Sequence, residues 1–116
     1  MVIKHYDEVK PGTYEGVPAG VQLREMITQA DGAPNFSMRV FDVTPGASTP
    51  FHTHEWEHEV FIISGTGTVC TEGKETAFKT GDSVFIAPNE KHCFRADRGG
   101  PVRLICCIPS KERCRL

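Results

Sequence analysis

The residues with the clearest chemistry in this 116-residue chain are histidines gathered in one short segment. The stretch FHTHEWEHEV holds His52, His54 and His58, three of the five histidines in the chain. Neutral imidazole is a common ligand of zinc, copper, iron and nickel. Further along the chain, His92 is a fourth candidate ligand. The sequence therefore predicts a metal site, provided that the fold brings His92 beside the other three.

The letters HEWEH (54–58) also match the H-E-x-x-H signature of zinc metalloproteases. That site needs its two histidines one turn apart on a helix, so that both face the metal. Proline and glycine residues precede the segment and the β-branched run VFIIS follows it. At most about nine residues could then be helical, which is marginal even for good helix formers. A protease helix is a poor explanation of the motif.

A strand explains the histidines better than a helix. Residues i and i+2 of a β-strand point to the same side, so His52 and His54 would face one way. After a short connection we expect the chain to return antiparallel, with His58 on the facing strand. His92 opens another expected strand after a Pro-Asn turn. Four imidazoles could converge in this way without any helix.

Short β-rich runs between Gly and Pro residues indicate an all-β sandwich or barrel. The runs are FSMRVFDV (36–43), EVFIIS (59–64), SVFIA (83–87) and VRLICCI (102–108). We expect hairpin turns at SGTG (64–67) and TEGKE (71–75). The length suits a single domain over residues 1–116.

Charge and composition exclude several classes of partner. The formal net charge is −2 and no block of like charges is present, so neither nucleic acid nor an anionic membrane is an expected partner. No apolar stretch approaches the ~18 residues of a membrane span, and no signal peptide is visible. We expect a soluble, cytoplasmic protein. Its five cysteines form no C-x-x-C pair and should be free thiols there.

The segment around the first three histidines resembles the first motif of the cupin superfamily, G-x5-H-x-H-x3,4-E-x6-G. Gly46, His52, His54, His58 and Gly65 stand in this chain at the spacing of that motif. The resemblance implies a double-stranded β-helix, the cupin jelly-roll barrel.

The second cupin motif, G-x5-P-x-G-x2-H-x3-N, is matched more loosely. Gly81, Pro88 and His92 are present, the internal glycine is replaced, and Ala96 stands where Asn is usual. Together the two motifs span residues 46–96, about half of the chain.

One departure concerns the fourth ligand, which is usually Glu in this superfamily. His58 stands at that position, and the neighbouring Glu59 would fit the longer spacing. Strand alternation puts Glu59 on the opposite face, and Gly65 follows at the family spacing only when counted from His58. We therefore favour His58 and keep Glu59 as the alternative.

The chain resembles small single-domain cupins with a four-histidine centre. That resemblance implies His52, His54, His58 and His92 as ligands of a divalent first-row metal: Mn(II) first, then Fe(II), with Zn, Ni or Cu as other candidates. It also implies a homodimer, in whose interface residues 1–20 could pack. Two coordination positions would be open, which favours a metal-dependent oxidoreductase of dioxygenase or peroxide-using type, acting on a small organic substrate. The alternatives are a non-catalytic ligand-binding or sensor cupin and a non-redox isomerase or lyase.

Pocket residues follow from strand parity. Leu104, Cys106 and Ile108 share one face of their run, and would lie near the metal if that face lines the barrel. Phe94 shares the face of His92 and could form pocket wall. Arg39 could orient a carboxylate substrate in the pocket or lie on the solvent face. A place for Trp56 at the pocket rim or in a dimer contact stays open.

Overall fold

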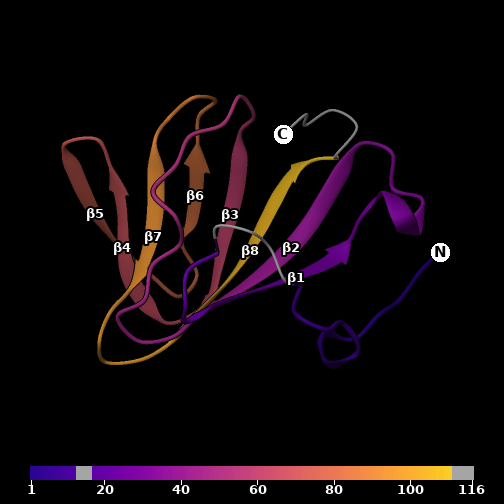
Figure 1. Ribbon diagram of the computed structural model, residues 1–116, viewed down its shortest axis with the longest axis horizontal. Coiled ribbons are helices and arrows are strands. Elements are labelled where there is room, and N and C mark those ends of the chain that lie inside the picture. Colours follow the sequence, from indigo (N-terminus) through magenta and orange to yellow (C-terminus); the bar gives the residue numbers. More distant parts are fainter. Residues whose placement is uncertain (13–16, 111–116) are drawn as a thin grey trace.

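The computed structural model describes residues 1–12 and 17–110 as a two-layered β structure (Figure 1). The strands are β1 (Val21–Ile27), β2 (Phe36–Val43), β3 (His58–Ser64), β4 (Thr66–Thr71), β5 (Lys74–Lys79), β6 (Ser83–Ile86), β7 (His92–Ala96) and β8 (Val102–Pro109). Two short 3-10 helices, η1 (Tyr6–Glu8) and η2 (Gln29–Asp31), flank β1.

All strand pairs in the two sheets are antiparallel. One sheet has the order β1-β2-β8-β3-β6 and the other the order β5-β4-β7. Single β-bridges from Ser48 to Arg95 and from His52 to His92 place the segment before β3 beside β7. The predicted all-β jelly-roll barrel is confirmed by this arrangement.

The core lies between the two sheets and follows the two-residue period of the strands. In β3, Val60 and Ile62 are buried while Glu59 and Phe61 between and beside them are exposed. In β8, Val102, Leu104, Cys106 and Ile108 are buried in the same alternating way. These β-branched and apolar side chains fill the space between sheets and fix the register of each strand. The inward face of β8 therefore borders the space in which the candidate site lies.

Gly65 carries the chain from one sheet into the other. The predicted hairpin at SGTG (64–67) is wrong, because β3 pairs with β6 and β8 whereas β4 pairs with β5 and β7. Gly65 has a φ of 101°, and a Cβ there would lie 2.3 Å from the carbonyl oxygen of Pro101. Only glycine fits this close approach. The second predicted hairpin, at TEGKE (71–75), is confirmed as the β4–β5 connection.

The N-terminal residues pack on the outer side of the larger sheet. The Tyr6 hydroxyl hydrogen-bonds to Asp42 and Arg24, and Arg103 Nε donates to Asp42 at 2.7 Å. Lys4 forms an ion pair with Asp31 at 2.8 Å. These contacts tie the start of the chain to its own β1 and β2, at the side where the N-terminus lies in Figure 1.

Candidate metal centre

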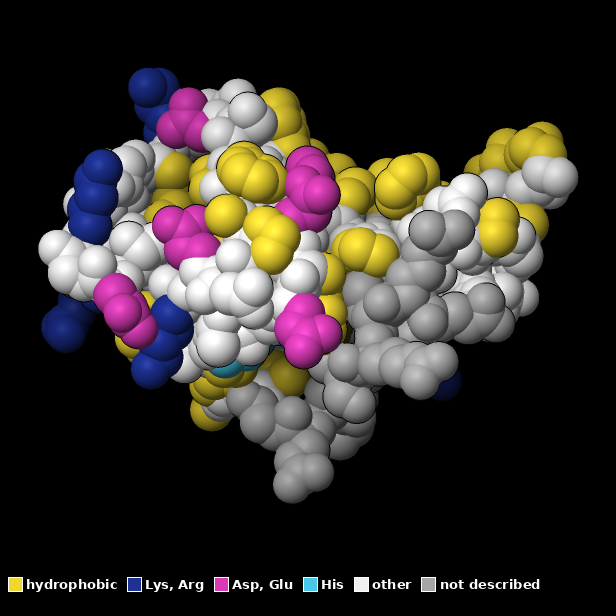
Figure 2. Space-filling view, turned by 90° about the horizontal axis from the view of Figure 1, so that it is seen from above, with side chains coloured by type: hydrophobic (Ala, Val, Ile, Leu, Met, Phe, Trp, Pro, Cys, Tyr) yellow, Lys and Arg dark blue, Asp and Glu magenta, His cyan; other side chains and the backbone are white. Residues whose placement is uncertain are grey.

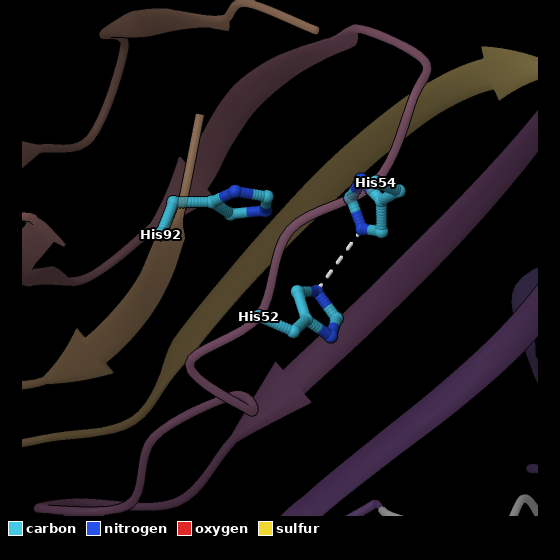
Figure 3. A group of neighbouring side chains, drawn as sticks. All are labelled: His52, His54 and His92. Atoms are coloured by element: carbon cyan, nitrogen blue, oxygen red, sulfur yellow. Dashed lines mark hydrogen bonds between the residues drawn. The ribbon is translucent and has the colours of Figure 1, made fainter. Parts of the chain in front are cut away.

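Three histidines from two segments meet between the sheets. One potential ligand atom from each of His52, His54 and His92 lies within 4.8 Å of the others, and their rings face a common space (Figure 3). The backbones of His52 and His92 exchange two hydrogen bonds, of 3.1 and 2.9 Å. This bridge holds the two segments together and sets the distance between their side chains.

His58 brings a fourth ring to the same place from the opposite sheet. Its Nε2 atom lies 3.0 Å from Nδ1 and 3.1 Å from Nε2 of His54, and its ring centroid is 5.1 Å from that of His92. The predicted hairpin between His54 and His58 is wrong. β3 pairs with β6 and β8, whereas His52 bridges to β7, so the chain crosses between the sheets at Glu55–Glu57.

The two buried histidines are each held through Nδ1. His92 Nδ1 lies 2.7 Å from the carbonyl oxygen of Glu90, which can only accept a hydrogen bond. Nδ1 of His92 is therefore protonated, and its Nε2 keeps the lone pair that a metal needs. His58 Nδ1 lies 2.9 Å from the sulfur of Cys106. Backbone carbonyls such as that of Glu90 orient ligand imidazoles in metal sites in this way.

The spacing of the ring nitrogens fits a metal ion. His54 Nε2 is 3.1 Å from the Nε2 atoms of both His52 and His58. Two nitrogens bound at right angles to one ion, each about 2.1 Å from it, are about 3.0 Å apart. Uncharged imidazoles that bring lone pairs so close need either shared protons or a cation between them. The donor set therefore fits a divalent ion.

Burial lowers the pKa of three of the histidines, His52, His54 and His58. It is the main cause that lowers the pKa of His54 to about 4, with the neighbouring His52 and His92 adding to the effect. The pKa of His58 is lowered further, again chiefly by burial. The pKa of His52 is lowered by the same cause, with smaller contributions from His92 and Arg39. Neutral imidazoles are ready to bind a metal near neutral pH without first losing protons.

Exposure is uneven across the cluster. His58 and His92 are buried, His54 is half-buried and His52 is exposed, so the cluster opens to solvent on the His52 side. Little histidine surface reaches the face shown in Figure 2, where apolar side chains are interspersed with acidic and basic ones. The indole of Trp56 stacks on His54 at 4.5 Å and 11°. Trp56 thus lies against the imidazole of His54.

Glu59 lies on the other side of its strand. It is exposed on the outer face of the larger sheet, opposite Phe85 and Cys107 in the register. A hydrogen bond with Glu57, more than burial, raises the pKa of its carboxyl. Strand alternation separates Glu59 from the imidazoles, as expected from the sequence.

Two of the predicted pocket residues, Cys106 and Phe94, lie beside the histidines. Leu104, Cys106 and Ile108 are buried on the inward face of β8, and Phe94 is buried with its ring centroid 6.3 Å from that of His92. Arg39 pairs with Cys106 across β2 and β8, and its Nη2 lies 3.4 Å from the Cys106 sulfur. Arg39 therefore points inward rather than into solvent.

Two contacts of the site had no signal in the sequence. The Glu90 carbonyl belongs to the backbone, so no residue type could reveal that it holds His92. The Cys106–His58 contact needs the β3–β8 pairing to be known. Of the five cysteines, four are free thiols, and Cys114 lies outside the described residues.

A protein-family comparison matches residues 39–108 to the cupin domain. The chain belongs to the cupin domain family. This cupin resembles the solved structure of the polyketide cyclase RemF from Streptomyces resistomycificus, with a TM-score of 0.86 and 31% identity over 94% of this chain and 79% of that one.

Two curated relatives extend the comparison. An L-ectoine synthase from Mycolicibacterium gilvum is 27% identical over 91% of this cupin and 81% of its own length. An oxalate-binding protein from Thermotoga maritima is 39% identical over a shorter part, 41% of this chain and 40% of that protein. Relatives of this cupin thus carry out different functions. No helix among residues 1–12 and 17–110 is long and apolar enough to cross a membrane.

Proposed function

We propose that this cupin is a metal-dependent enzyme whose centre is built from His52, His54, His58 and His92. The observation that carries the proposal is the meeting of four imidazoles from two sheets. Ring nitrogens of His52 and His58 lie 3.0–3.1 Å from those of His54. One of His92 lies within 4.8 Å of His52 and His54. The Nδ1 contacts of His58 and His92 support it, because they leave Nε2 of each ring toward the centre.

Four neutral imidazoles leave the full charge of a divalent ion uncompensated. Such a centre would be a stronger Lewis acid than one with three histidines and a glutamate, and would polarise a bound carbonyl oxygen. The resemblance of the sequence to four-histidine cupins supports Mn(II) first and Fe(II) next. Imidazole donors also suit Zn, Ni and Cu.

The substrate is a small organic molecule that reaches the centre from the open His52 side. We place a non-redox reaction first, such as an isomerisation, cyclisation or elimination. Two proteins that align with most of this chain are named a cyclase and a synthase. The oxidoreductase predicted from the sequence is the second candidate, supported by the all-histidine donor set and its open side.

A reaction screen with small β-dicarbonyl compounds separates these functions. The protein, loaded with Mn(II) or with Zn(II), is incubated with each compound in air and under nitrogen. The masses of the products are then measured by mass spectrometry. Non-redox chemistry predicts products of unchanged mass or with water lost, formed equally under nitrogen and with zinc. Products that gain oxygen only in air, with Mn(II), would support the oxidoreductase instead. Binding without any product would favour a ligand-binding cupin.

We also propose that this cupin forms a homodimer. The outer face of the larger sheet supports the proposal, because Phe36, Phe61, Ile63 and Phe85 are exposed on it. Large apolar side chains exposed on one sheet face are typical of an interface between proteins. The predicted role of residues 1–20 in that interface and the cytoplasmic location remain part of the proposal.

A further inference from the structure

Arg39 brings a positive charge into the space between the sheets. Its neighbour across the β2–β8 ladder is the buried Cys106, whose sulfur lies 3.4 Å from Arg39 Nη2. The guanidinium carbon lies 5.1 Å from the ring centroid of Phe41. Since Cys106 also contacts His58 at 2.9 Å, the guanidinium lies one side chain away from the histidine cluster.

Three other arginines among residues 1–12 and 17–110 are held in ion pairs. Arg24, Arg95 and Arg103 each form an ion pair with an aspartate or glutamate. Arg39 instead has Glu25 opposite it in the β1–β2 register and Cys106 opposite it in the β2–β8 register. Its Nε atom is buried and has no hydrogen-bond partner among the same residues. A buried guanidinium nitrogen without a hydrogen-bond partner is costly unless an acceptor compensates it.

The positive charge of Arg39 affects the histidines of the centre. Burial is the largest cause of the low pKa of His52, His54 and His58, and Arg39 contributes to the lowering in all three. No carboxylate is among the groups that shift these three pKa values. A divalent ion held by neutral imidazoles would add to the same positive potential, so the space beside Arg39 and the histidines should attract anions.

We propose that Arg39 is an anion subsite, which binds the carboxylate of a small organic acid whose other end reaches the histidine centre. The guanidinium offers several donors in a planar fork that matches a carboxylate, and such charge-assisted pairs are strong where water is excluded. This inference rests on the proposed metal centre. It narrows the substrate of that centre to small organic acids. Phe41 and Leu104 line the inward face beside Arg39 and suit a short carbon skeleton.

Calorimetric titration of the metal-loaded protein with a series of probes tests this subsite. The probes are oxalate, malonate and succinate, each compared with its neutral diamide, so that no single spacing between the two ends is assumed. At least one acid should bind about tenfold or more tightly than its diamide. Arg39→Gln should remove most of that preference, and Arg39→Lys should retain part of it. Arg95→Gln is the matched control, because it removes an equal charge from a half-exposed position outside the site.

Metal content, measured on the same samples, separates the subsite from the proposed function. If Arg39→Gln keeps its metal but loses acid binding, both proposals are supported. If no metal is retained by any sample but acid binding to the metal-free protein still depends on Arg39, the subsite stands without the metal centre. Equal binding of the acids by wild type and Arg39→Gln, or acids that bind no better than their diamides, would overturn the subsite.

Discussion

The Nδ1 atom of His58 lies 2.9 Å from the sulfur of Cys106, and both side chains are buried between the two sheets. This contact directs Nε2 of His58 toward His54. Partners that orient a ligand imidazole typically change metal affinity by about 10–100-fold when removed.

Loss of the Cys106 thiol should therefore weaken metal binding. We expect Cys106→Ala to lower the affinity about tenfold or more, whereas Cys106→Ser keeps a polar partner for Nδ1 and loses less. Competition with a chelator of known affinity measures the change. The control is Cys107→Ala, because Cys107 lies next in the sequence but is half-buried on the other face of β8. Equal losses in both variants would show that the His58 contact does not matter.

The single tryptophan of the chain should report on the centre. Trp56 stacks on His54 at 4.5 Å, so an ion bound to that imidazole lies close to the indole. Titration of the metal-free protein with Mn(II) or Co(II) should quench the Trp56 emission until the site is filled. In His54→Ala the same titration should leave the emission nearly constant. Unchanged emission in the wild type, at metal concentrations that calorimetry shows to saturate it, would place the ion away from His54.

The buried histidines should make the metal-free protein sensitive to acid. The pKa of His54 is lowered to about 4 in the folded protein, chiefly by burial, and that of His58 lies lower still. The unfolded chain takes up these protons near pH ~6.5. Stability should be complete above that pH and fall progressively as the pH drops toward 4, because protons then favour the unfolded state.

Thermal melting across this pH range checks the prediction. The curve for His54→Gln should fall less steeply than that of the wild type. His5→Gln is the control, because His5 is exposed near the N-terminus, and its curve should follow the wild type. A wild-type melting temperature that stays constant between pH 6.5 and 4 would be inconsistent with buried, neutral histidines.

The apolar face of the larger sheet should hold the proposed dimer together. Phe61 and Phe85 are 45% and 61% exposed there, and stable interfaces bury about 800 Å² on each partner. Light scattering after size exclusion should give twice the 12.8 kDa chain mass for the wild type. The double variant Phe61→Glu/Phe85→Glu should be monomeric. Phe51→Ser, at a comparably exposed position in the loop before His52, should remain dimeric. A wild-type mass of 12.8 kDa would refute the dimer.

The local parts of the fold and site could be predicted from the sequence, and the long-range parts could not. The two-residue period placed His58 inside and Glu59 outside β3 correctly, because parity depends only on neighbouring residues. The crossing at Gly65 could not be predicted. A glycine between two β-rich runs is compatible with a hairpin, and only the pairing of β3 with distant β6 and β8 rules that out.

Arg39 shows the same limit at the site. An arginine within an apolar run can belong to either face of its strand, and the sequence left both open. The pairing of Arg39 with Cys106 on β8 turns it inward, and this pairing joins residues far apart in the chain. The contact from Cys106 to His58 depends on a further pair, β3 with β8. Chemistry that arises from such pairings becomes visible only in the folded chain.

The most direct test of the central claim is the metal content of the purified protein and two variants. The protein is prepared without a histidine tag or chelators, and metals are quantified by mass spectrometry in wild type, His58→Ala and Glu59→Ala. We expect about one equivalent of a first-row metal in the wild type and in Glu59→Ala, and its loss in His58→Ala. Metal that is retained in His58→Ala but lost in Glu59→Ala would identify the Glu59 carboxylate as the fourth ligand. A wild type that holds no metal, even after reconstitution, would contradict the proposed centre.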